Sequence, residues 1–387
     1  MPKLIRLPFA LGAAAVLLAS AGTASAGPDA TLSTAAPAKE ASIFDEIWSW
    51  PSIYKNNEAE ILNEIRFVGR FQVDQYNVDS DLGHDQDWIV RRLRLGLKVD
   101  LFQRHLQLHV ETDIDPQNDN PAYRRLTDAY LAWKFSEALK LTVGKQGAKF
   151  TLDGATSSTE LITIDRSNLA NNFWFTEEYV PGVSLSGKYD HWLYNAGFFS
   201  GGTKTPEFGN FDAGNFGLAS LGYDFGSVLG VKKAVLRGDY VYNQRNKEST
   251  FTRSFENLGS LVFMLDNKNW GLSTDFTRGQ GFGSQGDAFG LQVMPWYNIT
   301  EKLQAVFRYT YLSGDEPNSI RFARYENTLT GGKGDEFNEI YGGLNYYFYG
   351  HRLKLQTGLS YATMHDRAND GGQYEGWSWT TGVRISW

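Results

Sequence analysis

Apolar and polar residues alternate along most of this chain with a period of two. Between residues 92 and 99, Arg92, Arg94 and Lys98 take even positions, and leucine or valine takes every odd position. Successive side chains of a β-strand point to opposite faces, so each such segment predicts a strand with one polar and one apolar face. Because the alternation recurs as far as the C-terminal tryptophan, the sequence predicts an all-β protein.

About sixteen such segments follow one another, and an even number of antiparallel strands is the rule for bacterial outer-membrane barrels. Their predicted ranges are 64–73, 88–99, 105–114, 126–135, 139–146, 179–189, 192–200, 214–226, 233–243, 257–266, 269–278, 287–298, 302–313, 337–349, 352–363 and 377–387. Short turns alternate with long connections, and the long ones cover residues 74–87, 115–125, 147–178, 201–213, 244–256, 314–336 and 364–376. This arrangement favours a transmembrane antiparallel β-barrel over a soluble sandwich or propeller.

The N-terminus carries the features of an export signal. Lys3 and Arg6 precede an apolar run, and Ala24-Ser25-Ala26 resembles a cleavage site with small residues. We therefore predict a secretory signal peptide over residues 1–26 and a location in the bacterial outer membrane.

Two further regions follow the signal peptide. Residues 27–62 are predicted to form a periplasmic N-terminal segment, in which Ile43, Ile47 and Trp48 indicate a short amphipathic helix. Residues 63–387 are predicted to form the barrel itself.

The composition agrees with this class of protein. The chain has no cysteine, which excludes disulfides and thiolate metal sites, and 14% of its residues are aromatic. Outer-membrane barrels place aromatic residues in two girdles at the membrane interfaces. The residues expected in these girdles are Trp133, Phe135, Trp192, Trp270, Trp296, Tyr309, Tyr311, Tyr346 and Phe348.

The stretch 143–168 interrupts the alternation and is the candidate for function. It carries Lys145, Lys149 and Arg166, several small turn residues, and an apolar run over residues 161–164. A long connection with its own packing residues inside a regular β protein is usually functional. We expect this third loop to fold into the lumen, where its cations narrow a pore.

Cations outnumber acids on the strand faces that are expected to line the lumen, although the formal net charge of the chain is −7. The cations are Arg66, Arg70, Arg92, Arg94, Lys98, Lys134, Lys140, Arg237, Lys302, Arg308, Arg352, Lys354 and Arg384; the acids are Glu64, Glu111, Asp113, Asp128, Asp239 and Glu339. Acid is expected to concentrate in the first outer loop instead, at Asp74, Asp79, Asp81, Asp85 and Asp87. Rings of arginine and lysine make a pore prefer anions.

Two interpretations stay open for each lumen cation. It either faces the pore and attracts anions, or it pairs with an acid and braces the wall. Arg92 and Arg94 share one strand face, roughly 6.6 Å apart along the strand, and could form an anion eyelet with the loop cations. Arg166 could instead pair with Asp153 or Glu160 and hold the loop.

Four groups of residues resemble a known family. They are Val68-Gly69-Arg70-Phe71-Gln72, Arg91-Arg92-Leu93-Arg94-Leu95-Gly96, Asp128-Ala129-Tyr130-Leu131, and Leu141-Thr142-Val143-Gly144-Lys145 running into Phe150, Ser157-Ser158, Leu161 and Asp165-Arg166-Ser167. In these residues the chain resembles the phosphate-selective porin O and P family. The resemblance implies a sixteen-stranded barrel, a homotrimer, an inward third loop, and arginines and lysines that guide anions.

We predict an outer-membrane diffusion porin with anion preference, for which phosphate and polyphosphate are candidate substrates. The residues expected to bind anions or line the pore are Arg66, Arg70, Arg92, Arg94, Lys98, Lys145, Lys149, Arg166 and Arg308. The expected partners are small phosphate-like anions, outer-membrane lipid and two further copies of the chain, with no nucleic acid. No cofactor and no enzymatic activity are expected.

Two other functions remain as alternatives. One is a structural barrel or adhesin whose long loops bind a partner. The other is a barrel enzyme such as a lipase, although no G-x-S-x-G motif is present. The G-x-G-x-x-G at residues 281–286 has no helix predicted after it, and His105 and His109 would lie about 13 Å apart on a strand, so neither a dinucleotide nor a metal site is expected.

Overall fold

The structure is a computed structural model that describes residues 42–117, 122–174, 178–200, 207–208, 214–245, 253–322 and 325–387. The predicted signal peptide, residues 1–26, lies outside the described residues. Residues 27–41 of the predicted N-terminal segment also lie outside them. Residues Ile43–Trp387 form one compact unit. Among the described residues, none of the helices has the length and apolar character that a membrane span requires.

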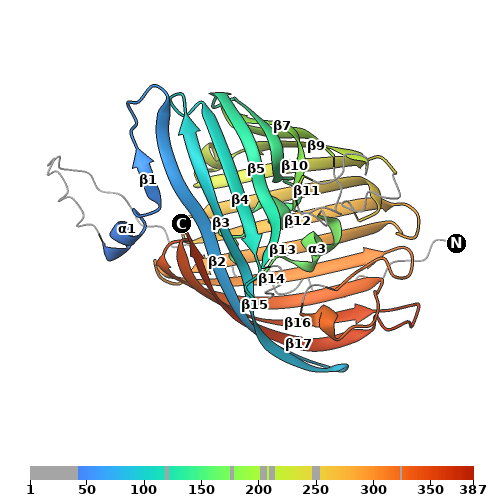
Figure 1. Ribbon diagram of the computed structural model, residues 1–387. Coiled ribbons are helices and arrows are strands. Elements are labelled where there is room, and N and C mark those ends of the chain that lie inside the picture. The colour runs from blue at the N-terminus through green and yellow to red at the C-terminus, as the bar shows by residue number, and fades with distance from the viewer. Residues whose placement is uncertain are drawn as a thin grey trace, which may run out of the picture. The chain divides into compact units, whose positions relative to one another are not determined.

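Sixteen antiparallel strands, β2 to β17, form a closed barrel within the described part of the chain (Figure 1). Consecutive strands pair with each other, and β17 pairs with β2 to close the ring. The strands are β2 Leu62–Ser80, β3 Gly83–Leu101, β4 Leu106–Ile114, β5 Tyr123–Ser136, β6 Leu139–Gly147, β7 Tyr179–Tyr189, β8 Trp192–Ser200, β9 Asn215–Asp224, β10 Lys233–Asn243, β11 Phe255–Asn267, β12 Trp270–Gly281, β13 Ala288–Asn298, β14 Leu303–Gly314, β15 Glu336–Tyr349, β16 Leu353–His365 and β17 Tyr374–Ser386. The predicted fold class is confirmed.

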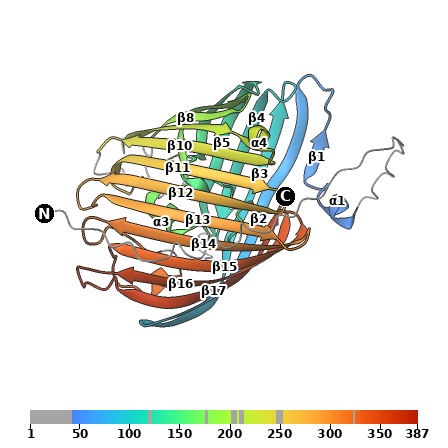
Figure 2. The same cartoon turned by 180° about the vertical axis from the view of Figure 1, so that it is seen from behind.

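One predicted connection is wrong. Residues 74–87 were expected to form a long first loop, but β2 and β3 continue as a hairpin to Ser80 and Gly83. Only Asp81 and Leu82 lie between the two strands. The hairpin projects well beyond its neighbours (Figures 1 and 2). In its outer half the outward positions are polar (Gln75, Asn77 and Asp79), so the apolar outward face that marks a membrane strand is absent there.

The N-terminal part of the compact unit covers the seam of the barrel at its short-turn end. Helix α1 (Ile43–Ile47) lies within the range predicted for a short helix, and Trp48 Nε1 donates a hydrogen bond to the Ser386 carbonyl at 2.6 Å. Strand β1 (Ser52–Lys55) pairs with Glu64–Arg66 of β2, just beyond the point where β17 ends. The chain therefore contributes a short strand to the wall before the barrel begins.

The outward strand faces carry the apolar residues that the alternation predicts. Leu97, Leu131 and Val143 are each about half exposed, as side chains that face lipid should be. Most of the expected girdle residues are also on this outward face. Trp296 is the exception, because it shares the inward parity of Met294 and packs against a cluster inside the barrel.

The connection between β6 and β7 crosses the interior of the barrel. It contains the short helices α2 (Leu152–Ala155) and α3 (Asn168–Phe173), and α3 is visible within the ring of strands in Figure 1. Leu152 N donates to Asp275 on β12 at 2.6 Å, whereas Ser158 O accepts from Gln72 on β2 at 3.1 Å. Bonds to strands so far apart in the ring place the connection across the lumen.

A second long connection also packs inward. Residues 315–335, between β14 and β15, include the 3₁₀ helix η2 (Glu326–Thr328), and Ile320, Phe322 and Tyr325 in this segment are buried. They join α3 and lumen-facing residues in one large apolar cluster. The sequence did not predict this second inward loop. The remaining helix, α4 (Gly226–Leu229), lies in the turn between β9 and β10.

Candidate functional site

The third loop is fastened to the wall by polar side chains of β15 and β16. Lys354 Nζ donates to the Leu161 carbonyl at 2.5 Å, and Gln356 Nε2 donates to the same oxygen at 3.1 Å. Asn345 Nδ2 donates to the Ile162 carbonyl at 2.7 Å. The polar side chains on the inward face of these strands thus donate hydrogen bonds to loop carbonyls, which would otherwise be buried without partners.

The apolar run of the loop docks on an apolar patch of the inner wall. Ile164 packs with Met294, Val306 and Tyr341, all of which face inward. The Tyr341 hydroxyl also accepts a hydrogen bond from Ile164 N at 3.2 Å. The run that stood out in the sequence is therefore a docking segment, and inward apolar residues on the strands complement it.

Two arginines of the wall also hold this part of the loop. Arg308 forms a buried ion pair with Glu339 at 2.7 Å, donates to the Asp165 carbonyl at 2.9 Å, and lies over the Tyr341 ring. Arg384 pairs with Asp74 and donates to the Ile164 carbonyl at 3.0 Å. Asp74 was predicted to lie in an acidic outer loop, but it is fully buried on β2 and faces the lumen.

On β2 and β4, the predicted cation Arg70 is a bridge between wall and loop. It pairs with Glu111 at 3.1 Å and donates to Ser158 Oγ at 2.8 Å. Its neighbour Gln72 links Arg92 to the loop, because Gln72 accepts from Arg92 at 2.8 Å and donates to the Ser158 carbonyl. Both arginines lie on the lumen face, and both take part in loop attachment.

Arg94 is almost entirely enclosed, with 1% of its side chain exposed. Its guanidinium donates to the Tyr179 hydroxyl at 2.5 Å and lies 3.5–3.6 Å from carboxylate oxygens of Glu178 and Asp113. An ion pair network of this kind braces the wall. This is the second of the two interpretations that the sequence left open for each lumen cation. Arg94 therefore does not form an open eyelet with Arg92.

Arg91 also contacts the loop, although it was not among the pore-lining residues expected from the sequence. A register shift opposite Gln72 and Val73 turns both Arg91 and Arg92 toward the interior, and Arg91 Nε lies 3.6 Å from Asp165 of the loop. Strict alternation assigns Arg91 to the lipid face. A charge on a lipid-facing position is costly, and this was the available signal that the parity changes here.

The three cations predicted on the loop have different environments. Arg166 donates to the carbonyls of Asp153 and Thr156 at 2.8 and 2.9 Å and stacks on Trp174, so it holds the loop in shape. Lys145 lies on β6 opposite Ala129, on the parity of the outward Val143, and donates to the Glu207 carbonyl. Lys149 is exposed at the start of the loop.

A second set of lumen cations is accessible to solvent. Arg66 and Lys98 are directly opposite each other on β2 and β3, and Lys140 on β6 interacts electrostatically with Lys98 and Lys149. Arg66 and Lys98 are partly exposed, and Lys140 and Lys149 are exposed. None of the four forms a hydrogen bond or ion pair with another described residue. We call Arg66, Lys98, Lys140 and Lys149 the open cation band.

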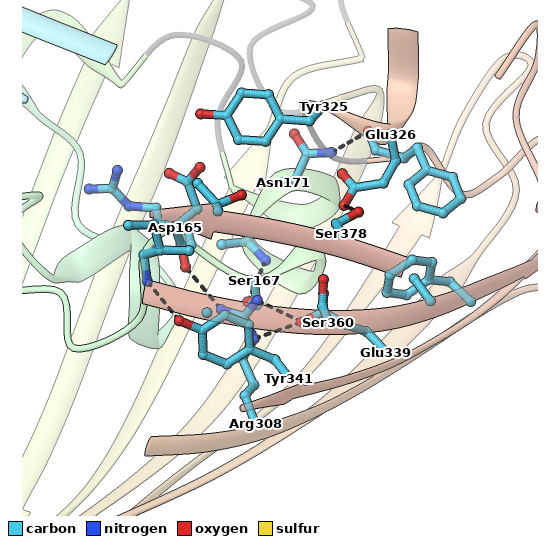
Figure 3. A pocket seen from close by; sticks show the side chains of 18 of the residues that line it. Asp165, Ser167, Asn171, Arg308, Tyr325, Glu326, Glu339, Tyr341, Ser360 and Ser378 are labelled. Atoms are coloured by element: carbon cyan, nitrogen blue, oxygen red, sulfur yellow. Dashed lines mark hydrogen bonds and ion pairs between the residues drawn. The ribbon is translucent and has the colours of Figure 1, made fainter. Parts of the chain in front are cut away.

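Loop and wall enclose a cavity of about 270 Å³. Figure 3 shows Arg308, Glu339 and Tyr341 on one side of it and Tyr325 and Glu326 on the other. Its charged lining residues are Asp165, Arg166, Glu178, Arg253, Arg308, Glu326 and Glu339. The cavity is therefore mixed in charge, and one of its acids, Glu326, belongs to the second inward loop, which the sequence did not predict.

Arg253 stands at the long-loop end of this cavity. Burial, and then the positive charge of Arg321, lowers the pKa of Arg253 to about 10. Burial also lowers the pKa of Lys333, with Arg321 and Arg253 as further causes. These three loop cations were not singled out from the sequence, because they come together only when residues 315–335 fold inward.

The closed barrel, its alternating faces and the loop across its lumen define an outer-membrane porin. The family model for phosphate-selective porin O and P matches residues 65–255 of this chain. No curated protein sequence matches the chain.

Solved structures show the same fold at low sequence identity. An anion-selective porin from Comamonas acidovorans is 11% identical, with a TM-score of 0.60 over 84% of this chain and 99% of that one. OmpF of Salmonella typhi in complex with daunomycin is 12% identical, with a TM-score of 0.60 over 87% and 100%. The outer-membrane channel DcaP of Acinetobacter baumannii is 14% identical, with a TM-score of 0.56 over 86% and 99%.

Proposed function

We propose that this porin is a passive diffusion channel that prefers small anions, and that it transports rather than catalyses. The observation that carries the proposal is the open cation band. Arg66, Lys98, Lys140 and Lys149 present positive charge to the lumen, whereas the more deeply buried arginines are engaged with acids and loop carbonyls. Rings of cations of this kind make a pore favour anions.

The geometry of the lumen strengthens the effect of these charges. The third loop crosses the lumen, and we propose that it narrows the passage beside the band. A charged passage whose width is comparable to the Debye length of about 8 Å is screened poorly by salt. Low-dielectric walls then focus the field and raise the local concentration of anions.

Phosphate-like anions are the substrate class that we propose within this preference. A guanidinium binds two oxygens of a phosphate at once, whereas an ammonium group acts as a point charge. Arg66 supplies such a group in the band, and the family is described as phosphate-selective. The similar anion-selective porin supports the general preference. A homotrimer in outer-membrane lipid is the assembly that we propose.

The reversal potential in a salt gradient across a planar bilayer tests the anion preference. We expect Arg66→Gln with Lys98→Gln to move the anion-to-cation permeability ratio toward unity. The matched control is Lys302→Gln, an exposed lysine in a turn at the same end of the barrel. A double variant that migrates as a folded barrel and keeps the parent's ratio would contradict the proposal.

A separate experiment tests whether Arg66 binds phosphate. Arg66→Lys keeps the charge but removes the two-oxygen geometry. We therefore expect phosphate to block chloride current less in this variant, while chloride conductance without phosphate changes little. If phosphate blocks chloride current equally in the parent and in Arg66→Lys, Arg66 does not bind phosphate through two oxygens.

A further inference from the structure

Three residues with ligand atoms for a metal meet on the lumen face of β4 and β5. His109 and Glu111 are two positions apart on β4 and so share a face, and Asp128 on β5 is directly opposite Glu111. One ring nitrogen of His109 and one carboxylate oxygen of each acid all lie within 4.8 Å of one another. All three residues are at least nine-tenths buried.

The imidazole of His109 lacks partners for both of its nitrogens. Neither Nδ1 nor Nε2 has a hydrogen bond to any described residue, although both are buried. The ring packs edge-on against Tyr130, and its Nδ1 is 3.9 Å from an oxygen of Asp128. A buried polar atom without a partner destabilises the folded state. A ligand between His109 and the two acids would give the imidazole the partner that it lacks.

The two carboxyl groups of Glu111 and Asp128 also favour a cation between them, independently of His109. Carboxylates that lie this close cannot both carry charge unless a proton or a cation lies between them. Arg70 pairs with Glu111 at 3.1 Å, and within the described part of the chain Asp128 has no arginine or lysine ion pair. One divalent ion would satisfy the histidine and both acids together.

We infer that His109, Glu111 and Asp128 form a binding site for a zinc-class divalent metal ion in the wall of the lumen. Zinc sites with an open position use three nitrogen or oxygen ligands at about 2.0–2.2 Å, so the three side chains would have to close around the ion from the separations seen here. The inference does not depend on the proposed anion preference.

Neighbouring charges decide which metal fits. Arg66, Arg70 and Lys98 lie close to the site and repel any cation. Magnesium and calcium are hard cations that bind through several oxygens. Zinc gains a nitrogen ligand and coordinates borderline-soft groups, so it tolerates a less negative environment. The arrangement therefore selects zinc over magnesium and calcium.

Calorimetric zinc titration of the untagged, chelator-treated full-length protein, folded in detergent, tests the site. We expect one zinc ion per chain in the parent, at least tenfold weaker binding in His109→Asn and in Asp128→Asn, and no displacement by equal magnesium or calcium. The matched control is His105→Asn, because His105 lies at the turn before β4 and bonds the Lys134 carbonyl instead. Heat-dependent migration in gels shows which variants are folded.

X-ray absorption of the zinc-loaded parent supplies a measurement that needs no variant. One nitrogen and two or more oxygen neighbours are expected, and two imidazole ligands would overturn the assignment. If the folded parent binds no zinc, or if binding survives His109→Asn, a water or a shared proton fills this place and the inference is wrong. Failure of this titration leaves the anion preference intact, because the reversal potential is measured without zinc.

Discussion

Arg384 on the last strand and Asp74 on the first barrel strand form an ion pair across the seam of the barrel. The pair is nearly inaccessible, with 3% and 0% of the two side chains exposed. Arg384 also donates to the Ile164 carbonyl of the third loop, and Asp74 accepts from the Tyr325 hydroxyl of the second inward loop at 2.8 Å. Two residues thus join the seam to both loops.

Asp74→Asn should destabilise the folded barrel strongly. Removing one partner of a buried ion pair leaves an uncompensated charge and lowers the free energy of unfolding by about 3–5 kcal/mol. Urea unfolding, followed by gel migration without heating, measures the change. Arg104→Gln breaks the half-exposed pair with Glu64 and should cost about 0–1 kcal/mol. Similar losses in the two variants would mean that the seam pair is not buried in the folded protein.

Arg94 is predicted to matter for stability and not for selectivity. The double variant Arg94→Gln with Asp113→Asn removes one positive and one negative charge from the same enclosed network. We expect a lower free energy of unfolding, by about 1–3 kcal/mol for the lost charged hydrogen bonds, and an unchanged reversal potential. A clear loss of anion preference in this variant would return Arg94 to the pore-lining set.

Asn172 on α3 holds the two inward loops together. It donates to the Arg321 carbonyl at 3.0 Å and accepts from Arg321 N at 2.8 Å. Asn172→Ala removes both bonds, each contributing about 0.5–1.5 kcal/mol, so hydrogen exchange in residues 315–335 should accelerate roughly tenfold. Asn298→Ala, which removes a bond to the Lys268 carbonyl and a bond from Gln304 at the short-turn end, is the control. Unchanged exchange in both variants would show that the loops do not depend on each other.

Gly290 gives α3 its place against the wall. A Cβ at this position would lie 2.6 Å from Leu312 and 3.1 Å from both Leu169 and Phe173. Gly290→Val should therefore overpack the site, destabilise the barrel by about 1–3 kcal/mol and alter single-channel conductance. Gly217→Val is the matched control, because a Cβ there meets open space. If both variants conduct as the parent does, α3 is not seated on β13.

The period of two residues was enough to predict the barrel. It identified all the strands from β2 to β17, because lipid on one side and water on the other force the two faces to differ. It failed where the two faces of a strand do not meet lipid on one side and water on the other. The outer part of the β2–β3 hairpin projects beyond the apolar band, and Val306, Met294 and Trp296 face a loop inside the lumen.

The site was predictable in composition but not in arrangement. The sequence showed which cations share a strand face, and Arg70, Arg92 and Arg94 do face inward. Whether a cation is paired depends on contacts between residues far apart in the chain, such as Arg308 with the Asp165 carbonyl or Arg91 with the Asp165 carboxylate. Those contacts exist only because two loops fold inward, and no local pattern encodes them.

The short strand β1 has a consequence for how the ring is completed. Strand β17 pairs with β2 from Ser80 down to Arg70 and then ends, while β1 takes the same side of β2 from Arg66 to Glu64. An unpaired stretch of strand edge is a template for aggregation and mispairing. The residues that precede the barrel therefore cover a stretch of the β2 edge that β17 does not pair with. In a chain shortened to begin at Leu62, this part of the β2 edge would stay unpaired at the seam, where the first and last strands of the barrel meet.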